Sequence, residues 1–185
     1  MGFLHRIANP PRLIRPRCNG SWWKWFTYDS KRYALQVWNP KSVWAQQFSH
    51  IEAYDWSADW VVKARVEAVT NGKMVGVAHH RNPIPVDRPV IAKMTFAADG
   101  AEQTLYATRY QDKLNFHFTD GTSGHASYGS GRTVRIPADQ TGAVTIDFNY
   151  ATLLPCSFSR AWNCPIPPLE NRIRLPICCR RSKSA

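Results

Sequence analysis

The last third of the sequence contains charged and amide side chains that together could bind a ligand. Asp147 and Asn149 alternate with apolar residues, so in a strand they would face away from the core. Asp120 and Arg132 fall at the ends of neighbouring predicted strands. The planar guanidinium of Arg132 can hold a ligand carboxylate or phosphate through two hydrogen bonds. The same four residues can instead form a buried ion pair that fixes the register of the loops, and both interpretations stay open.

Three more polar residues complete the candidate set. A small-molecule or cofactor pocket at the mouth of a barrel would be lined by Asp120, Thr122, Tyr128, Arg132, Asp147, Asn149 and Asn171. The sequence assigns neither a particular cofactor nor an oligomeric state. One alternative function is a hydrolase-like or transferase-like enzyme that uses Asp147 or a cysteine–histidine pair. A structural or interaction module is the other alternative.

Two cysteines, Cys156 and Cys164, lie in a proline-rich stretch with seven residues between them. Zinc sites usually pair cysteines across two to four residues, so this spacing is poor for a metal. A disulfide between the two, or two reduced thiols packed in the fold, are the other interpretations. His117 or His125 could activate a cysteine nucleophile. The sequence contains no Walker loop, nucleophile elbow, dinucleotide fingerprint or zinc-protease motif.

Glycines and histidines offer two further candidate sites. Glycines at 121, 124, 129 and 131 could bring backbone amides close to an anion. Phosphate loops lead into a helix, however, and Thr133–Pro137 reads as a strand, so we predict tight turns at these glycines. His79 and His80 end an apolar strand, and we interpret them as a surface pair rather than as metal ligands.

The elements that must position these residues are strands, because apolar and polar side chains alternate along much of the chain. In Trp60–Val69, one face carries only apolar residues, and the other carries Lys63, Arg65 and Glu67. Asn71-Gly72 follows directly and is the strongest short hairpin signal. It predicts Met74–His79 as the returning partner strand.

The same pattern predicts strands at Tyr33–Trp38, Val90–Phe96, Glu102–Tyr110 and Lys113–Phe118, and one more that contains Val144, Ile146 and Phe148. A turn is predicted at Asp99-Gly100. The fold class is therefore mainly β, an antiparallel barrel or sandwich of roughly seven or eight short strands with one or two short helices. Ser42–Phe48 is a candidate short helix. Residues 151–171 form a predicted ordered loop, because prolines cannot donate to a ladder.

Basic residues concentrate at the two ends of the chain. The net charge is +11, but residues 1–24 and 171–185 contain ten of the 24 bases and no acid, leaving 14 bases and 13 acids between them. We therefore predict a basic N-terminal tail over 1–24, one β domain over 25–177 and a basic C-terminal tail over 178–185. A nearly neutral domain makes nucleic acid an improbable partner.

Cysteine count and hydropathy bear on location. The five cysteines are an odd number, and the first twenty residues lack the apolar run of a secretory signal, which favours a reducing compartment. We expect a cytoplasmic protein with no membrane span, while organelle targeting by the basic start stays open. The cluster Trp22-Trp23-Lys24-Trp25 could stack a base or sugar, but we favour rings that cover one end of the barrel.

The final third also carries a distinctive series of motifs. It contains Tyr128-Gly-Ser-Gly-Arg132 after an aspartate and a threonine, then Asp147-Phe-Asn149 and Pro155-Cys156. It ends with Cys164-Pro-Ile-Pro-Pro-Leu-Glu-Asn-Arg172. This series resembles the domain of unknown function 1684 family, and the resemblance covers about residues 25 to 177. It implies a common fold unit, and it implies no mechanism because the family has no assigned activity.

The sequence departs from that family at three places, namely Thr133, the 150–154 stretch and Cys178-Cys179-Arg180, and the second bears on function. Its members usually continue Asp-Phe-Asn with a stretch like Ala-Tyr-Asn-Pro, where this chain has Tyr150-Ala-Thr-Leu-Leu154. A function that needs asparagine and tyrosine side chains in the 150–154 loop is therefore not expected here.

Overall fold

The computed structural model describes residues 22–27 and 33–178. The chain separates into two compact units, Met1–Glu52 and Ala53–Ala185. This division falls inside the range 25–177 that the sequence predicts as one domain. The predicted tails lie outside the described residues, except that β1 begins at Trp22 and Cys178 is described.

The first unit contains a hairpin and a short helix. Strands β1 (Trp22–Thr27) and β2 (Tyr33–Trp38) pair antiparallel, from Trp22 opposite Trp38 to Thr27 opposite Tyr33. The helix α1 (Val43–Gln47) begins where the Ser42 hydroxyl accepts a hydrogen bond from the Ala45 amide, a typical N-cap. The predicted β2 strand and short helix are confirmed. The side chains of the tryptophan cluster lie outside the described residues.

The second unit is built on one antiparallel sheet of seven strands, in the order β10-β3-β6-β7-β8-β9-β11. A separate two-stranded sheet pairs β4 with β5. The strands are β3 (Val61–Ala68), β4 (Met74–His79), β5 (Asn82–Pro89), β6 (Ala92–Ala98), β7 (Ala101–Tyr110), β8 (Lys113–Phe118), β9 (Arg132–Pro137), β10 (Gly142–Asp147) and β11 (Thr152–Leu153). The predicted mainly β, antiparallel fold is confirmed.

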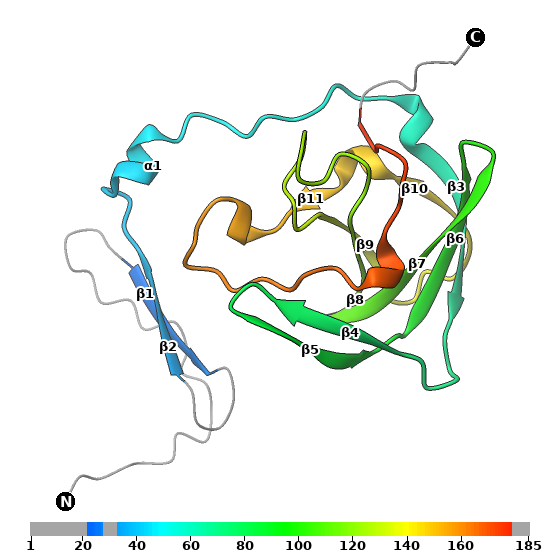
Figure 1. Ribbon diagram of the computed structural model, residues 1–185, viewed down its shortest axis with the longest axis horizontal. Helices are drawn as coiled ribbons and strands as arrows, with labels where there is room; N and C mark the ends of the chain where they lie inside the picture. The colour runs from blue at the N-terminus through cyan, green and yellow to red at the C-terminus, as the bar shows by residue number, and fades with distance from the viewer. Residues whose placement is uncertain (1–21, 28–32, 179–185) are drawn as a thin grey trace, which may run out of the picture. The chain divides into compact units, whose positions relative to one another are not determined.

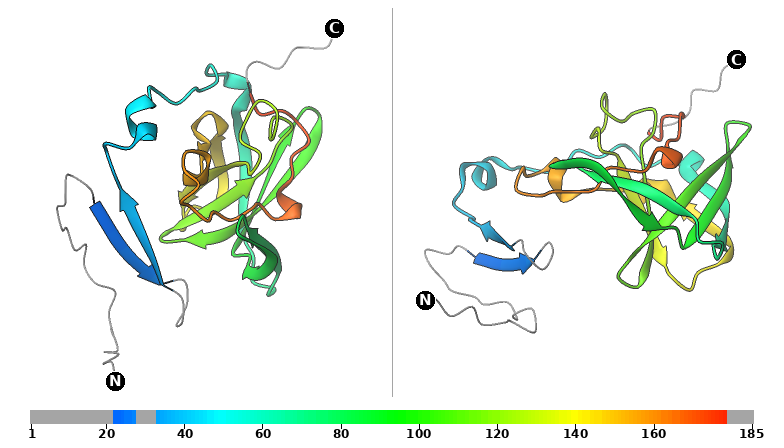
Figure 2. Two further views of the ribbon diagram at one scale, coloured as in Figure 1. Left: turned by 60° about the vertical axis from the view of Figure 1, so that its left-hand side comes forward. Right: turned by 60° about the horizontal axis from the view of Figure 1, so that its bottom comes forward.

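Four short 3-10 helices complete the second unit: η1 (Ala58–Trp60), η2 (Phe148–Tyr150), η3 (Pro155–Ser157) and η4 (Leu169–Asn171). The predicted loop over 151–171 therefore contains η3, η4 and the two residues of β11. Figures 1 and 2 show β3, β6 and β7 curling round one side of the unit, with the segment before η4 running alongside β4.

The core lies inside the curled sheet. Alternate residues of β3, β6, β8 and β10 are buried in one continuous apolar cluster, as the alternation of the sequence predicts. Phe148 is 1% exposed, and its ring packs against Phe118 edge to face with 5.5 Å between the ring centroids. Phe148 lies in η2 rather than in the strand that the sequence predicts to contain it.

The predicted hairpin at Asn71-Gly72 is wrong. Strand β4 pairs with β5, and both edges of β3 are occupied by β10 and β6. Gly72 does adopt a left-handed φ of 74°, so the local turn signal is real. The turn redirects the chain into a different sheet, because the long-range partners of β3 already provide its ladder.

Strand β5 was missed because Asn82–Pro89 contains prolines at 83, 85 and 89. Each proline lacks a backbone donor, which argues against a central strand but is compatible with an edge. The strand has β4 as its single neighbour in the described sheet, and all its residues are exposed. The missing donors therefore cost this strand little.

Asn171 joins two strands where their ladder opens. β7 and β8 pair from Thr108 opposite Asn115 to Tyr110 opposite Lys113. Nearer the other end of β8, the Asn171 side chain accepts from the Tyr106 amide and donates to the carbonyls of Tyr106 and His117, each at 2.8 Å. The residue is 1% exposed. The side-chain amide of Asn171 thus provides the hydrogen bonds that a continued ladder between β7 and β8 would make there.

The Asn171→Leu variant should lose about 3 kcal/mol of unfolding free energy or more. The substitution leaves one backbone amide and two carbonyls buried without partners, and each such group costs about 1–3 kcal/mol. Urea denaturation measures the loss. The control is Asn115→Leu on β8, which should lose much less, because its side chain accepts from the exposed Arg135 and from no other described residue. Equal losses in the two variants would contradict the bridging role.

Candidate functional site

Asp120 and Arg132 form a buried ion pair. Asp120 follows β8 and Arg132 begins β9, and the side chains are 0% and 9% exposed. Arg132 Nη2 donates to Asp120 Oδ2 and also to the carbonyl of Ile177, at 2.6 Å from the latter. The Ile177 amide donates back to Asp120 Oδ2 at 3.1 Å. The pair therefore joins the turn after β8 to the last described residues of the chain.

The second carboxylate oxygen of Asp120 is equally occupied. Its Oδ1 accepts from the amide and the hydroxyl of Thr122 at 3.0 and 2.6 Å, and from the Ser123 hydroxyl at 3.2 Å. A carboxylate offers about four lone-pair sites, so Asp120 has no acceptor capacity left for a ligand. The buried Thr122 is part of the same turn. Asp120 and Arg132 therefore form a buried ion pair, which is one of the two arrangements that the sequence leaves open.

Arg132 is enclosed by aromatic rings. The guanidinium carbon lies 5.8 Å from the ring centroids of both Tyr54 and Phe118, which is the range of a cation–π contact. Its Nε is buried and has no hydrogen-bond partner among the described residues. The side chain is therefore held inside the fold rather than displayed to solvent.

Asp147 and Asn149 form a separate network. Asp147 Oδ1 accepts from the Asn149 amide at 2.9 Å and side chain at 2.6 Å, and so caps η2. Asn149 in turn bonds the Ser57 backbone, accepting from its amide at 3.0 Å and donating to its carbonyl at 2.9 Å. Within the described residues, no hydrogen bond joins this network to Asp120 or Arg132. The predicted four-residue cluster is therefore not assembled.

A different group of side chains comes together around Tyr128. We call it the Tyr128 cluster, and it consists of His80, Tyr128, Ser130, Cys156 and Cys164. The Tyr128 hydroxyl donates to the Cys156 carbonyl at 3.3 Å, and Ser130 Oγ lies 2.7 Å from His80 Nε2. The rings of His80 and Tyr128 have centroids 6.2 Å apart. Cys164 joins the cluster through its backbone carbonyl, which accepts from the His80 amide at 3.2 Å.

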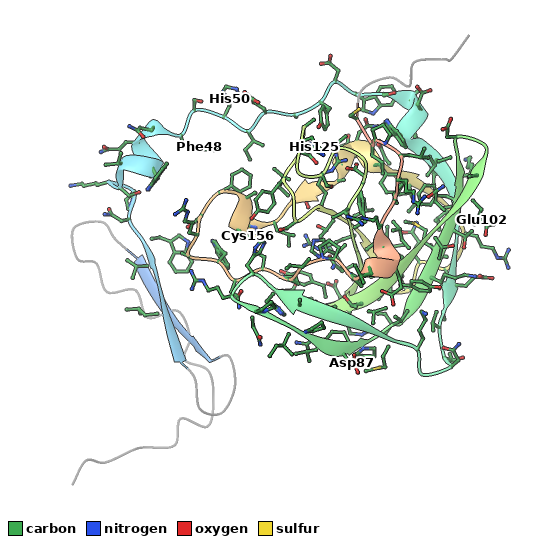
Figure 3. All side chains as sticks on the ribbon, in the orientation of Figure 1. Phe48, His50, Asp87, Glu102, His125 and Cys156 are labelled. Carbon is green, nitrogen blue, oxygen red and sulfur yellow. The ribbon has the colours of Figure 1, made fainter. Side chains whose placement is uncertain are left out.

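Three distant segments supply these residues: the end of the β4–β5 hairpin, the loop between β8 and β9, and the segment around η3. Figure 3 shows Cys156 at η3. The hairpin is tied to the segment 163–166 through the His80 amide to the Cys164 carbonyl at 3.2 Å, and the Ile166 amide to the Ala78 carbonyl at 2.8 Å. Backbone hydrogen bonds thus fix where the side chains meet.

The Gly129-Ser130-Gly131 turn brings Ser130 into the cluster. Gly131 has a φ of 75°, and a Cβ there would lie 2.0 Å from the Phe118 carbonyl oxygen. Only glycine fits such an approach, so the tight-turn interpretation of this glycine is correct. The chain continues into strand β9 rather than into a helix, which a phosphate loop would require.

Burial shifts the pKa of three side chains in and around the cluster towards their uncharged forms. It raises the pKa of Tyr128 and raises the pKa of the Cys164 thiol to about 12. It also lowers the pKa of His117 to about 4, although the hydrogen bond to the Ser130 carbonyl at 2.9 Å opposes this. At neutral pH these side chains offer hydrogen bonds rather than charge.

Sequence reasoning named Tyr128, Cys156 and Cys164 but missed the other two members. Ser130 stood out only as part of the Tyr128-Gly-Ser-Gly-Arg132 motif, and His80 only as one of a predicted surface pair. His80 is exposed as expected, yet its imidazole contacts Ser130. No signal in the sequence joins the two, because 49 residues separate them.

The cysteine–histidine pair proposed from sequence has a different arrangement. The His117 imidazole bonds a backbone carbonyl, and His125 is exposed on the loop between β8 and β9 (Figure 3). In residues 22–27 and 33–178, no group of three or more His, Cys, Asp or Glu side chains is arranged to hold a metal ion. Nor does that part of the chain contain a helix of the length and hydropathy needed to span a membrane.

Fold and site together define a mainly β protein with a curled antiparallel sheet and a cluster of polar side chains around Tyr128. Residues 46–179 match the model of the family described as protein of unknown function (DUF1684). The chain belongs to this family. The matched range begins later than residue 25, where the resemblance in the sequence was expected to start.

One solved structure supports the same relationship. It is the solution NMR structure of an uncharacterized protein from gene locus rrnAC0354 of Haloarcula marismortui, with 27% sequence identity and a TM-score of 0.57. The similarity covers 71% of this chain and 75% of that one. No curated protein matches the sequence. The comparisons therefore place the chain in a family with no assigned activity.

The Asp120→Asn variant should lose about 3–5 kcal/mol of unfolding free energy, because it leaves the buried Arg132 without a counter-charge. Chemical denaturation measures the loss. The matched control is Glu67→Gln, which breaks an ion pair with the exposed Arg65 and should leave the free energy of unfolding nearly unchanged. A tolerated Asp120→Asn substitution would show that the pair does not hold the fold.

Stability should fall on acidification because of His117. Its folded pKa of about 4 lies below the ordinary value of 6.5, so the unfolded chain binds a proton more readily between these values. This contribution is fully present above pH 6.5 and is lost as the pH falls towards 4, by about 3 kcal/mol. Denaturation curves of wild type and His117→Gln at both pH values measure it, and identical pH dependence in the two proteins would refute it.

Proposed function

We propose that the second unit binds a small polar molecule at the Tyr128 cluster. The observation that carries this proposal is the meeting of the Tyr128 phenol, the His80 imidazole and the Ser130 hydroxyl beside the segment around Cys156, so that three distant segments contribute. His80 is exposed, and Tyr128 and Cys156 are half-buried, so a molecule from solvent can reach them. The other predicted binding residues, Asp120, Thr122, Arg132, Asp147, Asn149 and Asn171, serve each other or the backbone in hydrogen bonds.

The chemistry of the cluster favours an uncharged, hydrogen-bonding ligand. Phenol, imidazole and hydroxyl groups each donate and accept, and burial keeps the phenol protonated. The ring of Tyr128 adds an apolar face beside these polar atoms. A nucleic-acid partner is not part of the proposal, because residues 25–170 carry 14 bases against 13 acids. We also propose a cytoplasmic location, supported by the odd number of cysteines.

One contact favours a second function, a hydrolase-like or transferase-like enzyme. Ser130 Oγ lies 2.7 Å from His80 Nε2, the separation of a nucleophile and its general base. In this variant of the proposal, Ser130 would attack a ligand held by Tyr128, and His80 would accept the proton. The Ser130 side chain is buried at 8% exposure, so such a substrate would have to enter the cluster.

A thermal-shift screen of the full chain with riboflavin, nucleosides and neutral sugars tests the binding proposal, and nucleotides serve as charged counterparts. A compound at 100 times its dissociation constant adds about 2.7 kcal/mol of stability. We expect Tyr128→Phe to lose most of the ligand-induced shift, because the variant lacks the phenol hydroxyl. Tyr150→Phe is the matched control, since Tyr150 is 77% exposed and should respond like wild type.

The outcomes separate the functions. A hit whose shift survives Tyr128→Phe would place binding elsewhere and refute the site. A hit that is chemically converted by wild type, and bound but not converted by Ser130→Ala, would establish the enzyme. A screen in which no compound stabilises the protein would contradict the binding proposal and favour a structural or interaction module.

A further inference from the structure

The first unit displays large apolar side chains to solvent. In the part of this unit whose side chains the structure describes, residue 35 and residues 37–52, none is buried. Six of them are large, apolar and exposed, and we call them the 35–48 surface: Leu35, Val37, Trp38, Val43, Trp44 and Phe48. Exposed apolar groups that gather in one segment mark a contact with a partner or a membrane.

Two elements order this surface. Leu35 and Val37 are two residues apart in β2, so they lie on one face of the hairpin. Trp44 and Phe48 are one helical turn apart at α1, because the Phe48 amide donates to the Trp44 carbonyl at 3.1 Å, and they are 84% and 56% exposed (Figure 3). A helix of a globular unit normally buries its apolar stripe, but α1 has no buried residue. Its apolar side chains are therefore available to a partner.

The same unit is strongly basic. Residues 1–52 contain eight of the 24 lysines and arginines and only two of the 13 acids, a formal charge of +6. This unit thus carries more than half of the net charge of +11 in less than a third of the chain. Among the described residues, the exposed Lys41 directly precedes the Ser42 cap of α1. A positive charge of this size attracts anionic surfaces.

The composition of the 35–48 surface decides between the possible partners. Nucleic-acid bases stack on aromatic rings, and the aliphatic Leu35, Val37 and Val43 offer no such plane. A second copy of the chain would bring the same positive charge to the contact, and like charges repel. A membrane interface accepts both aliphatic and aromatic groups, and tryptophan is enriched there because its ring is amphipathic.

We propose that the first unit binds the surface of membranes that contain anionic lipids. The 35–48 surface enters the boundary between headgroups and acyl chains, and the positive charge of the unit is attracted to the headgroups. The cytoplasmic leaflet carries such lipids, which agrees with the location proposed above. This binding does not involve the Tyr128 cluster, so the two proposals can fail separately.

Flotation of the full chain with lipid vesicles provides the test. Vesicles of phosphatidylcholine and phosphatidylserine in equal parts should carry the wild type upwards, and vesicles of phosphatidylcholine alone should bind it at least about tenfold more weakly. Raising the salt to about 0.5 M should weaken binding to the mixed vesicles several-fold, because salt screens the attraction.

Two variants separate the apolar and the charged contribution. Trp44→Ser combined with Phe48→Ser should lower the affinity for mixed vesicles at least about tenfold, because both apolar groups are lost from the interface. Lys41→Glu leaves the 35–48 surface intact and should lower it several-fold. The matched control combines Ile84→Ser with Leu169→Ser, which removes two apolar side chains of the second unit, 72% and 87% exposed, and should bind like wild type.

Three results would overturn the proposal. The first is flotation of the Trp44→Ser, Phe48→Ser variant like wild type, and the second is equal binding of the wild type to both kinds of vesicle. The third is a wild type that does not float but forms a dimer in sedimentation equilibrium, or binds a single-stranded RNA oligonucleotide, in a way that this variant does not. That result would assign the 35–48 surface to a second copy or to RNA.

Discussion

The buried ion pair between Asp120 and Arg132 is the interaction on which this part of the fold depends. Removing such a charge from water costs several kcal/mol, and the cost is offset only when its oxygens are fully paired. Arg132, the Ile177 amide and donors from Thr122 and Ser123 provide that pairing. Because these donors come from β9, the turn after β8 and the end of the described chain, the pair fixes the loop that carries Tyr128 and Ser130.

Because the buried charged and amide side chains already have partners, the groups that a ligand could bind lie elsewhere. Asp120 and Arg132 form hydrogen bonds with each other and with the backbone. Asn171 bonds the backbone where the ladder between β7 and β8 opens. The side chains that meet near the surface are Tyr128, His80 and Ser130, next to Cys156. Their contacts connect the β4–β5 hairpin, the loop between β8 and β9 and the segment around η3. The candidate site therefore lies where side chains as well as backbone pairing join distant segments.

Several elements could be predicted because their cause is local. The apolar alternation of β3 and β8, the turn at Asp99-Gly100, whose residues have φ of 54° and 71°, and the Ser42 cap of α1 depend on a few adjacent residues. The partner of β4 could not be predicted in this way. Asn71-Gly72 specifies a turn but not a ladder, and β5 was hidden by prolines that an edge strand tolerates.

The amino-acid sequence by itself determined the mainly β class, the buried face of each predicted strand and the membership of a family through its final third. The buried faces in question are those of β3, β8 and β10, and they follow from the side-chain period, whereas the family follows from motifs along the chain. Only the tertiary structure decided that Asp147 and Asn149 bind Ser57 rather than Arg132, and that His80 meets Ser130 across 49 intervening residues. The physical reason is that hydrogen bonds reach about 3 Å in space, whatever the separation in sequence.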